Sequence, residues 1–151
     1  MLSIIDDVLE LSRIESGHVT LQESAAEVGS VFDDCLLMVQ PEIEKKHQTL
    51  LKSKEILYPY VCFDTSHVTE IILNLMSNAI KYTGDGGTIT CKIRQFPHPK
   101  EGWGNQKLSV ADNGISMSEE FQAHIYESFT RERSSTVSGI EGTGLGLIWA
   151  L

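Results

Sequence analysis

Two amides and a cation recur at helical spacing in one stretch of the chain. Asn74, Asn78 and Lys81 occupy positions i, i+4 and i+7 of a periodic segment, residues 68–82, and therefore project from one face of the expected helix. Amide oxygens are neutral ligands suited to Mg²⁺, which is usually shared with substrate phosphates, and an ammonium group beside them can meet phosphate charge. A solvated polar face explains the same spacing. The opposite face is apolar and expected to be buried: Ile72, Leu75, Met76 and Ala79.

A short polar turn, Asp112-Asn113-Gly114, follows an apolar strand pattern. A buried carboxylate there could accept a hydrogen bond from the exocyclic amine of adenine, and the glycine would let the backbone approach the ring closely. Asp-Asn-Gly is also a common turn sequence, so an ordinary turn is the alternative.

A glycine-rich segment near the end of the sequence leads into an apolar run, and it reads Gly142-Thr143-Gly144-Leu145-Gly146-Leu147. Glycines let backbone N–H groups crowd a phosphate, and a helix N-terminus adds a favourable dipole. The segment is neither a Walker loop nor the dinucleotide fingerprint, and a flexible linker is the alternative. The preceding residues, 130–141, include Arg131 and Arg133. Their composition is typical of a mobile lid loop that closes on a triphosphate, and an ordinary surface loop is the alternative.

The elements that must position these residues alternate between helix and strand patterns. Helices are predicted at residues 2–14, 25–46, 68–82 and 118–126; Pro41 should kink or break the second, and Asp64, Thr65 or Ser66 should cap the third. Strands are predicted at residues 18–22, 49–51, 60–63, 88–96 and 108–111, with turns at 52–55 and 83–87 and a long hairpin loop at 97–106. We expect an α/β (α+β) two-layer sandwich, with a mixed sheet covered on one face by helices and preceded by an N-terminal amphipathic helix.

Length and charge limit the class of protein. The chain has 151 residues, enough for one domain, and a formal net charge of −9 with no basic stripe, so nucleic acid is not an expected partner. No apolar run approaches the roughly 20 residues that span a bilayer, so we expect a cytoplasmic segment without membrane contact, in a parent protein that could be membrane-anchored. Cys35, Cys62 and Cys91 are expected to be reduced, buried small hydrophobes.

Taken together and in this order, the motifs resemble those of sensor histidine kinases. Residues 74–83 resemble the N box, residues 112–114 the first Gly box, residues 125–132 the F box and residues 142–147 the second Gly box. Residues 4–17 are similar to the end of the second helix of the dimerisation hairpin. Four ordered boxes imply the Bergerat-type ATP-binding fold shared by gyrases, heat-shock chaperones and histidine kinases.

The resemblance implies a role for each matching residue. Asn78 and Asn74 would ligate Mg²⁺, Lys81 would contact phosphate, Tyr82 would pack beside adenine and Asp112 would read its amino group. The rest of the ATP pocket would be formed by Gly114, Arg131, Gly142, Thr143, Gly144, Leu145 and Gly146. Gyrase-like hydrolases carry a glutamate at the position of Asn74, and an amide cannot replace it as the base, which favours phosphoryl transfer to a histidine over hydrolysis.

The implied organisation places the end of the dimerisation hairpin at residues 1–17 and the ATP-binding catalytic domain, truncated at its C-terminus, at residues 18–151. None of the five histidines stands in the setting of a phosphoacceptor, so a hairpin outside this chain would have to supply it. The implied partners are that histidine-bearing hairpin, a second copy joined through the N-terminal helix, and a response regulator.

The missing phosphoacceptor and two further features leave a second hypothesis open. Ser116 replaces the second glycine of the first Gly box and could narrow the adenine pocket, and the sequence stops four residues after the second Gly box, where the family adds a helix end and two strands. The alternative to a kinase domain is therefore a non-catalytic or degenerate nucleotide-binding module of the same fold.

Overall fold

A computed structural model describes residues 9, 12–13, 16–17 and 19–115 of the chain. Its elements, in chain order, are β1 (Ser24–Glu27), α2 (Val28–Lys45), β2 (Thr49–Glu55), β3 (Tyr60–Phe63), α3 (Thr65–Tyr82), β4 (Thr88–Pro97) and β5 (Gly104–Asp112). Most of the helix expected at residues 2–14 lies outside the described residues, as do the helix at 118–126, the segment at 130–141 and the last glycine-rich turn.

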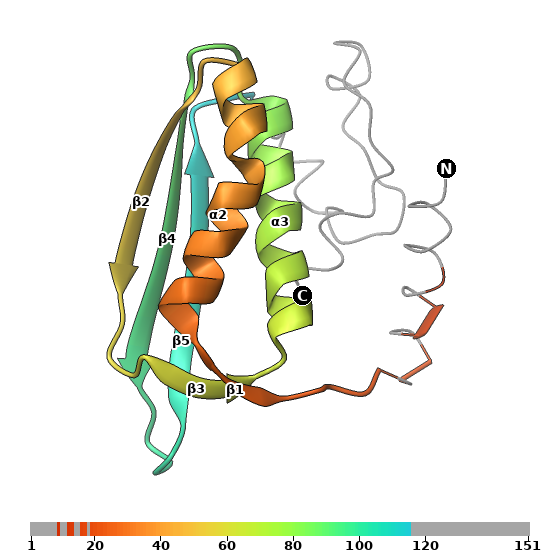
Figure 1. Ribbon diagram of the computed structural model, residues 1–151, viewed down its shortest axis with the longest axis vertical. Helices are drawn as coiled ribbons and strands as arrows, with labels where there is room; N and C mark the ends of the chain where they lie inside the picture. Colours follow the sequence, from red (N-terminus) through yellow and green to blue (C-terminus); the bar gives the residue numbers. More distant parts are fainter. Residues whose placement is uncertain (1–8, 10–11, 14–15, 18, 116–151) are drawn as a thin grey trace.

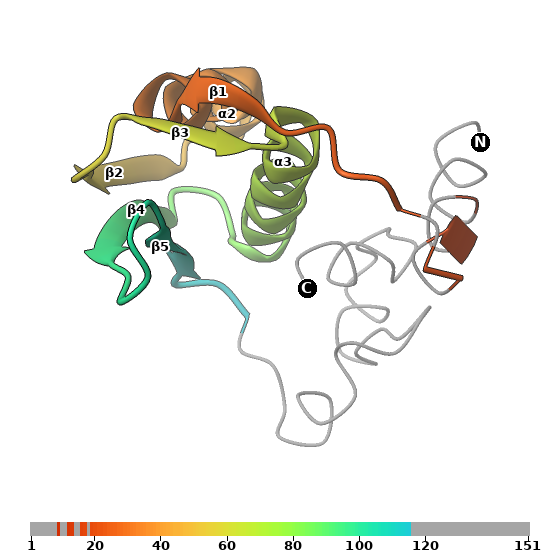
Figure 2. The ribbon, with the colours of Figure 1, turned by 90° about the horizontal axis from the view of Figure 1, so that it is seen from below.

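The main sheet is mixed, and both helices lie on one of its faces, as expected (Figure 1). β2 pairs with β4 in parallel, with Thr49 opposite Thr88, and β4 pairs with β5 antiparallel, with Ile89 opposite Asp112. Figure 2, turned to look along the layers, shows α2 and α3 on the same side of these strands. The register places the end of β5 beside the start of β4, at the end of the sheet where α3 also ends.

A second, two-stranded sheet crosses the opposite end of the molecule, where both helices begin (Figure 1). It joins β1 to β3 antiparallel, with Ser24 opposite Phe63. The prediction of a strand at residues 18–22 was wrong, because the segment that pairs with β3 is β1, Ser24–Glu27, and residues 19–22 lie outside any strand. Val19 and Leu21, whose alternation suggested that strand, are instead exposed.

The same pairing corrects the start of the next helix. Residues 25–27 were expected to be helical, but they pair with β3, and α2 begins at Val28. The expected break at Pro41 is absent, because α2 continues to Lys45. The carbonyl that loses its helical N–H partner belongs to Leu37, which is exposed, so water can satisfy it.

Two strands are longer than the sequence pattern suggested. Residues 52–55, expected as a turn, continue β2, because Lys52 and Lys54 lie opposite Cys91 and Ile93 in a full parallel ladder. β5 begins at Gly104, so the hairpin loop is shorter than the expected 97–106. Burial follows the two layers: the core consists of Val28, Phe32, Cys35, Leu36, Val39, Ile43, Ile72, Met76, Ala79, Ile80, Ile89, Cys91 and Ile93.

The cysteines do not share one environment. Cys35 and Cys91 are buried as expected, and burial raises the pKa of the Cys91 thiol to about 11. Cys62 is exposed on β3, against expectation. Of the two helices described, neither combines the length and apolar character needed to cross a bilayer.

Candidate functional site

Helix α3 carries the polar residues that the sequence singled out, and its start is fixed by Asp64. The Asp64 carboxylate accepts hydrogen bonds from the backbone N–H of His67 at 3.1 Å, as a helix cap, and from the backbone N–H of Gln22 at 2.7 Å. His67 Nδ1 lies 2.8 Å from the same carboxylate. The Gln22 and His67 hydrogen bonds lower the pKa of Asp64 to about 2. One side chain thus joins the beginning of α3 to the segment that precedes β1.

The faces of α3 separate largely as predicted. Ile72, Met76, Ala79 and Ile80 are buried against the core, whereas Asn74 and Asn78 are half-buried and Lys81 is exposed. Leu75 was expected in the core but is only half-buried, because it lies beside Asn74 and Asn78 on the other face. Among the described residues, the side-chain amides of Asn74 and Asn78 take part in no hydrogen bond, so two carbonyl oxygens on one face are available for a ligand.

The C-terminal end of α3 is capped by two side chains that the sequence reasoning missed. Lys46 Nζ donates to the carbonyl oxygens of Ile80 and Thr83 at 2.7 and 2.8 Å. Gln48 Nε2 donates to the same two oxygens at 3.1 and 2.7 Å. Carbonyls at a helix end have no partner within the helix, and a cation there also meets the negative end of the dipole.

The turn after β5 is held against this end of α3 and against the start of β4. The backbone N–H of Ile115 donates to the Tyr82 carbonyl at 3.0 Å, and the N–H of Thr88 donates to Asn113 Oδ1 at 2.8 Å. Gly114 N–H donates to Asp112 Oδ1 at 2.9 Å, which closes the turn. The turn interpretation and the site interpretation are therefore compatible, because the turn itself brings Asp112 to the end of the helix that carries Asn74 and Asn78.

One expectation about this turn needs correction. Asp112 was expected to be buried but is exposed, since it is the last residue of β5 and lies at the open end of the sheet. The close approach of Gly114 to an adenine ring stays a prediction, and the structure shows a close approach of backbone to backbone at this glycine. A Cβ on Gly114 would lie 2.7 Å from the Tyr82 carbonyl carbon and 2.8 Å from Thr83 Cα.

The described part of the site is thus one end of a helix and one end of a strand, joined by a fixed turn. The predicted site residues within the described range lie on α3 or at the end of β5 and in its turn: Asn74, Asn78, Lys81, Tyr82, Asp112 and Gly114. The remaining residues expected in the site lie outside the described residues: Arg131, Gly142, Thr143, Gly144, Leu145 and Gly146. Half-buried amides, an exposed cation and an exposed carboxylate are groups that can bind a metal-bound phosphate and a purine amine.

Comparison with known proteins defines the class. The model of the histidine kinase-, DNA gyrase B- and HSP90-like ATPase family matches residues 63–150, from the end of β3 through α3, β4 and β5. The chain belongs to this family of ATPase domains.

Curated relatives cover nearly all of the chain. The non-motile and phage-resistance protein of Caulobacter vibrioides is 32% identical over 148 residues, which is 97% of this chain and 17% of that protein. The cell-division control histidine kinase PdhS of Brucella anthropi is 26% identical over 155 residues, 97% of this chain and 14% of that protein. The chain thus spans less than a fifth of the length of either relative.

Solved structures share the fold. Full-length ShkA in complex with AMPPNP superposes with a TM-score of 0.79 at 22% identity, covering 98% of this chain and 29% of that one. Histidine kinase ThkA in complex with the response regulator protein TrrA superposes with a TM-score of 0.67 at 18% identity, covering 86% of this chain and 37% of that one. The two-layer architecture expected from the sequence is therefore that of histidine kinase ATPase domains.

Proposed function

We propose that this chain is the ATP-binding catalytic domain of a two-component histidine kinase and passes the γ-phosphoryl group of ATP to a histidine on a separate dimerisation hairpin. The observation that carries the proposal is the junction of α3 with the turn after β5. There the Ile115 N–H to Tyr82 carbonyl bond holds Asp112 at the end of the helix that bears Asn74 and Asn78. A relative named as a histidine kinase supports the same function.

The described residues fit a nucleotide with its metal. Asn78 and Asn74 would hold Mg²⁺ through their amide oxygens, which no hydrogen bond among the described residues occupies, and Lys81 would meet a phosphate. Mg²⁺, when bound, offsets the negative charge of the phosphate oxygens. Asp112 uses Oδ1 to close its own turn, which leaves Oδ2 to accept from the adenine amine, with Tyr82 beside the ring.

The residues outside the described range complete this proposal. Arg131 would meet the phosphates from the segment before the second Gly box. The backbone N–H groups of the Gly-rich segment would surround the same phosphates: Gly142, Thr143, Gly144, Leu145 and Gly146. ATP as the nucleotide is supported by the name of the matching family and by the AMPPNP complex of the structural neighbour ShkA.

The proposed organisation follows the sequence division. Residues 1–17 would end the dimerisation hairpin and join a second copy in the parent protein, and residues 18–151 would form the catalytic domain. A response regulator would receive the phosphoryl group, which is supported by the complex of ThkA with the response regulator TrrA. The domain would work in the cytoplasm, whether or not the parent protein is anchored in the membrane.

Thermal unfolding with and without Mg²⁺-AMPPNP tests nucleotide binding. A ligand that binds only the folded state adds about 2.7 kcal/mol of stability at 100 times its Kd, so we expect a rise in Tm that requires Mg²⁺. Asp112→Ala should abolish most of the rise, whereas Asp85→Ala, an exposed acid in the turn after α3, should keep it. An unchanged rise in Asp112→Ala would overturn the assignment of the adenine contact.

Transfer is tested separately with labelled ATP and an added dimerisation hairpin that carries its acceptor histidine. Acid-labile label on the hairpin supports the kinase function. A Mg²⁺-dependent rise in Tm without any transfer would instead support the alternative, a nucleotide-binding module that does no chemistry.

A further inference from the structure

The side chain of Lys46 lies against the end of helix α3 that carries the predicted phosphate and adenine contacts. Its Nζ donates to the carbonyl oxygens of Ile80, Lys81 and Thr83 at 2.7, 3.3 and 2.8 Å. An ammonium group has three N–H donors, so these three bonds use all of them. The residue is half-buried, and its charge meets the negative end of the helix dipole. Lys46 therefore fixes the last turn of α3.

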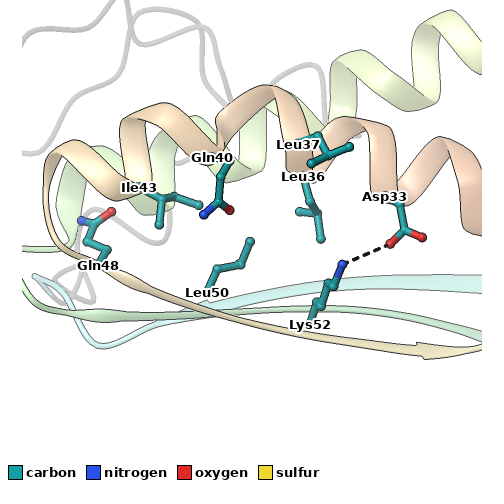
Figure 3. A pocket seen from close by; sticks show the side chains of 8 residues that line it. All are labelled: Asp33, Leu36, Leu37, Gln40, Ile43, Gln48, Leu50 and Lys52. Atoms are coloured by element: carbon teal, nitrogen blue, oxygen red, sulfur yellow. Dashed lines mark ion pairs between the residues drawn. The ribbon is translucent and has the colours of Figure 1, made fainter.

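Gln48 supports only part of this contact. It lies at one end of a cavity of about 180 Å³ between α2 and β2 (Figure 3), and its Nε2 donates to the carbonyls of Ile80 and Thr83 at 3.1 and 2.7 Å. Among the described residues, the Lys81 carbonyl accepts a side-chain hydrogen bond from Lys46 alone. A charged donor also forms a stronger hydrogen bond than a neutral amide does. Gln48 alone would therefore hold the helix end less firmly.

One route from Lys46 to the predicted adenine contact, Asp112, passes through the carbonyl group of Tyr82. The Lys46 side chain bonds the carbonyls on both sides of this residue. The Tyr82 carbonyl itself accepts from the N–H of Ile115 at 3.0 Å. A Cβ on Gly114 would lie 2.7 Å from the Tyr82 carbonyl carbon, so the turn that follows Asp112 also packs on this peptide group. The end of α3 thus sets the position of the turn.

A second route passes through the turn between α3 and β4. The backbone carbonyl of Lys46 accepts from the N–H of Gly86 at 2.9 Å, so one residue holds this turn with its backbone and the helix end with its side chain. The turn leads directly to Thr88, whose N–H donates to Asn113 Oδ1 at 2.8 Å. The N–H of Asn113 in turn donates to the Thr88 carbonyl at 3.2 Å. Both routes therefore end in the turn that begins with Asp112.

We propose that Lys46 is a positioning residue for the adenine contact. Its ammonium group keeps the end of α3 and the turn after β5 in the relative position in which Asp112 meets the adenine amine. The proposal rests on the ATP site proposed above. Lys46 acts through the carbonyls that it bonds, and not through a contact with the nucleotide.

The size of the expected effect follows from the fraction of molecules that are ready to bind. Without the ammonium group, the last turn of α3 opens more often, and the turn that carries Asp112 is then released with it. The apparent Kd rises in inverse proportion to the fraction of molecules in the competent arrangement. If about one molecule in five stays competent, the Kd of ATP rises about fivefold.

Removing the adenine amine from the ligand tests this role in the 151-residue chain. Purine riboside triphosphate has a hydrogen atom in place of the exocyclic amine of ATP, so it cannot donate to Asp112. Calorimetric titrations with Mg²⁺, far below the Tm of each variant, give the Kd of both ligands. The native chain should prefer ATP. In Lys46→Met we expect the Kd of ATP to rise about fivefold and that of the analogue to rise less than twofold, so that the preference falls.

Three further variants separate positioning from stability. Lys46→Arg keeps a cation with several N–H donors and should keep most of the preference for ATP. Lys45→Met removes an exposed cation one position earlier and should keep all of it. Ile93→Val removes a buried methylene group from β4, so it should lower the Tm but leave the preference unchanged. An equal loss of preference in Ile93→Val and Lys46→Met would overturn the proposal, because stability alone would then explain the effect.

The native sequence allows a second measurement, which decides even if Lys46→Met does not fold. Coupling between two parts of a network is reciprocal, so bound ATP should stabilise the network that positions Asp112. We expect saturating Mg²⁺-ATP to slow hydrogen exchange at the amides of Gly86 and Ile115 more than the saturating analogue does.

The outcomes distinguish this proposal from the ATP site on which it rests. Equal slowing of exchange by the two ligands, or an unchanged preference in folded Lys46→Met, would overturn the positioning role and leave the ATP site standing. Failure of the native chain to bind either ligand would overturn the ATP site and the positioning role with it.

Discussion

The backbone of Gly114 packs directly on the carbonyl group of Tyr82, so that a Cβ at position 114 would lie 2.7 Å from the Tyr82 carbonyl carbon. This contact joins the turn after β5 to the end of α3, and the Ile115 N–H to Tyr82 carbonyl bond beside it fixes the same junction. The site geometry therefore depends on a residue with no side chain.

Gly114→Ala should destabilise the fold and loosen the junction. The added methyl meets backbone atoms, which cannot move aside as a flexible side chain can, so we expect the free energy of unfolding to fall by about 1–3 kcal/mol in urea denaturation. Gly84→Ala is the matched control, because a Cβ there meets nothing within 4 Å. Equal stabilities of the two variants would contradict the close packing of Gly114 on Tyr82.

Lys46→Met should weaken the C-terminal end of α3. The substitution keeps most of the aliphatic stem but removes the ammonium group that bonds the Ile80 and Thr83 carbonyls. Hydrogen bonds to charged groups contribute about 1.5–3 kcal/mol to stability. Because Gln48 still donates to the same carbonyls, we expect the free energy of unfolding to fall by an amount near the lower end of that range. Lys45→Met, at the exposed neighbouring position, should change stability by less than about 0.5 kcal/mol. Hydrogen exchange of the Thr83 amide, which bonds the Ala79 carbonyl, should also quicken only in Lys46→Met.

The capping residues at the two ends of α3 show what the sequence could predict and what it could not. Asp64 was one of three N-cap candidates that the sequence offered, because an N-cap residue lies next to the helix that it caps. Lys46 and Gln48 act on a helix that ends more than 30 positions later, so no local pattern could identify them. Lys46 was expected only as the last residue of the helix predicted at residues 25–46.

The distinction between local patterns and contacts that are distant in the sequence also explains the other differences between the predicted and the observed structure. The periodicity of α3 predicted its buried Ile72, Met76 and Ala79, because helical spacing is a property of the segment itself. The strand at Ser24–Glu27 could not be distinguished from the start of α2, because only its pairing with Tyr60–Phe63 makes it extended. Asp112 was expected directly after a strand and is the last residue of β5, but its exposure depends on where β5 lies in the sheet.

The stability that Asp64 contributes should depend on pH in the acidic range. Its folded pKa, about 2, is below the ordinary value of 3.8, because the Gln22 and His67 hydrogen bonds favour the carboxylate. A depressed pKa gives stability that is complete above the unfolded pKa and is lost as the pH falls from about 4 toward 2. Native Asp64 should therefore be more stable than Asp64→Asn at pH 6, and the difference should shrink steadily below pH 4 in urea titrations. A difference that stays constant down to pH 2.5 would contradict the assigned hydrogen bonds.

Asn74→Glu tests whether the amide at this position is what separates phosphoryl transfer from hydrolysis. Asn74 is half-buried one helical turn before Asn78, so a carboxylate there would lie beside the proposed metal and phosphates and could accept a proton from water. We expect Asn74→Glu to release phosphate from Mg²⁺-ATP steadily without any protein acceptor, and Asn74→Gln, which has the same length but no basic oxygen, to release none above background. Malachite-green detection of phosphate measures both, with Asp112→Ala added to Asn74→Glu to show that release needs the nucleotide site. Release by Asn74→Gln equal to that of Asn74→Glu would mean that the carboxylate is not the base. No release by Asn74→Glu, in a variant that still gains Tm with Mg²⁺-AMPPNP, would place residue 74 too far from the γ-phosphoryl group to activate water.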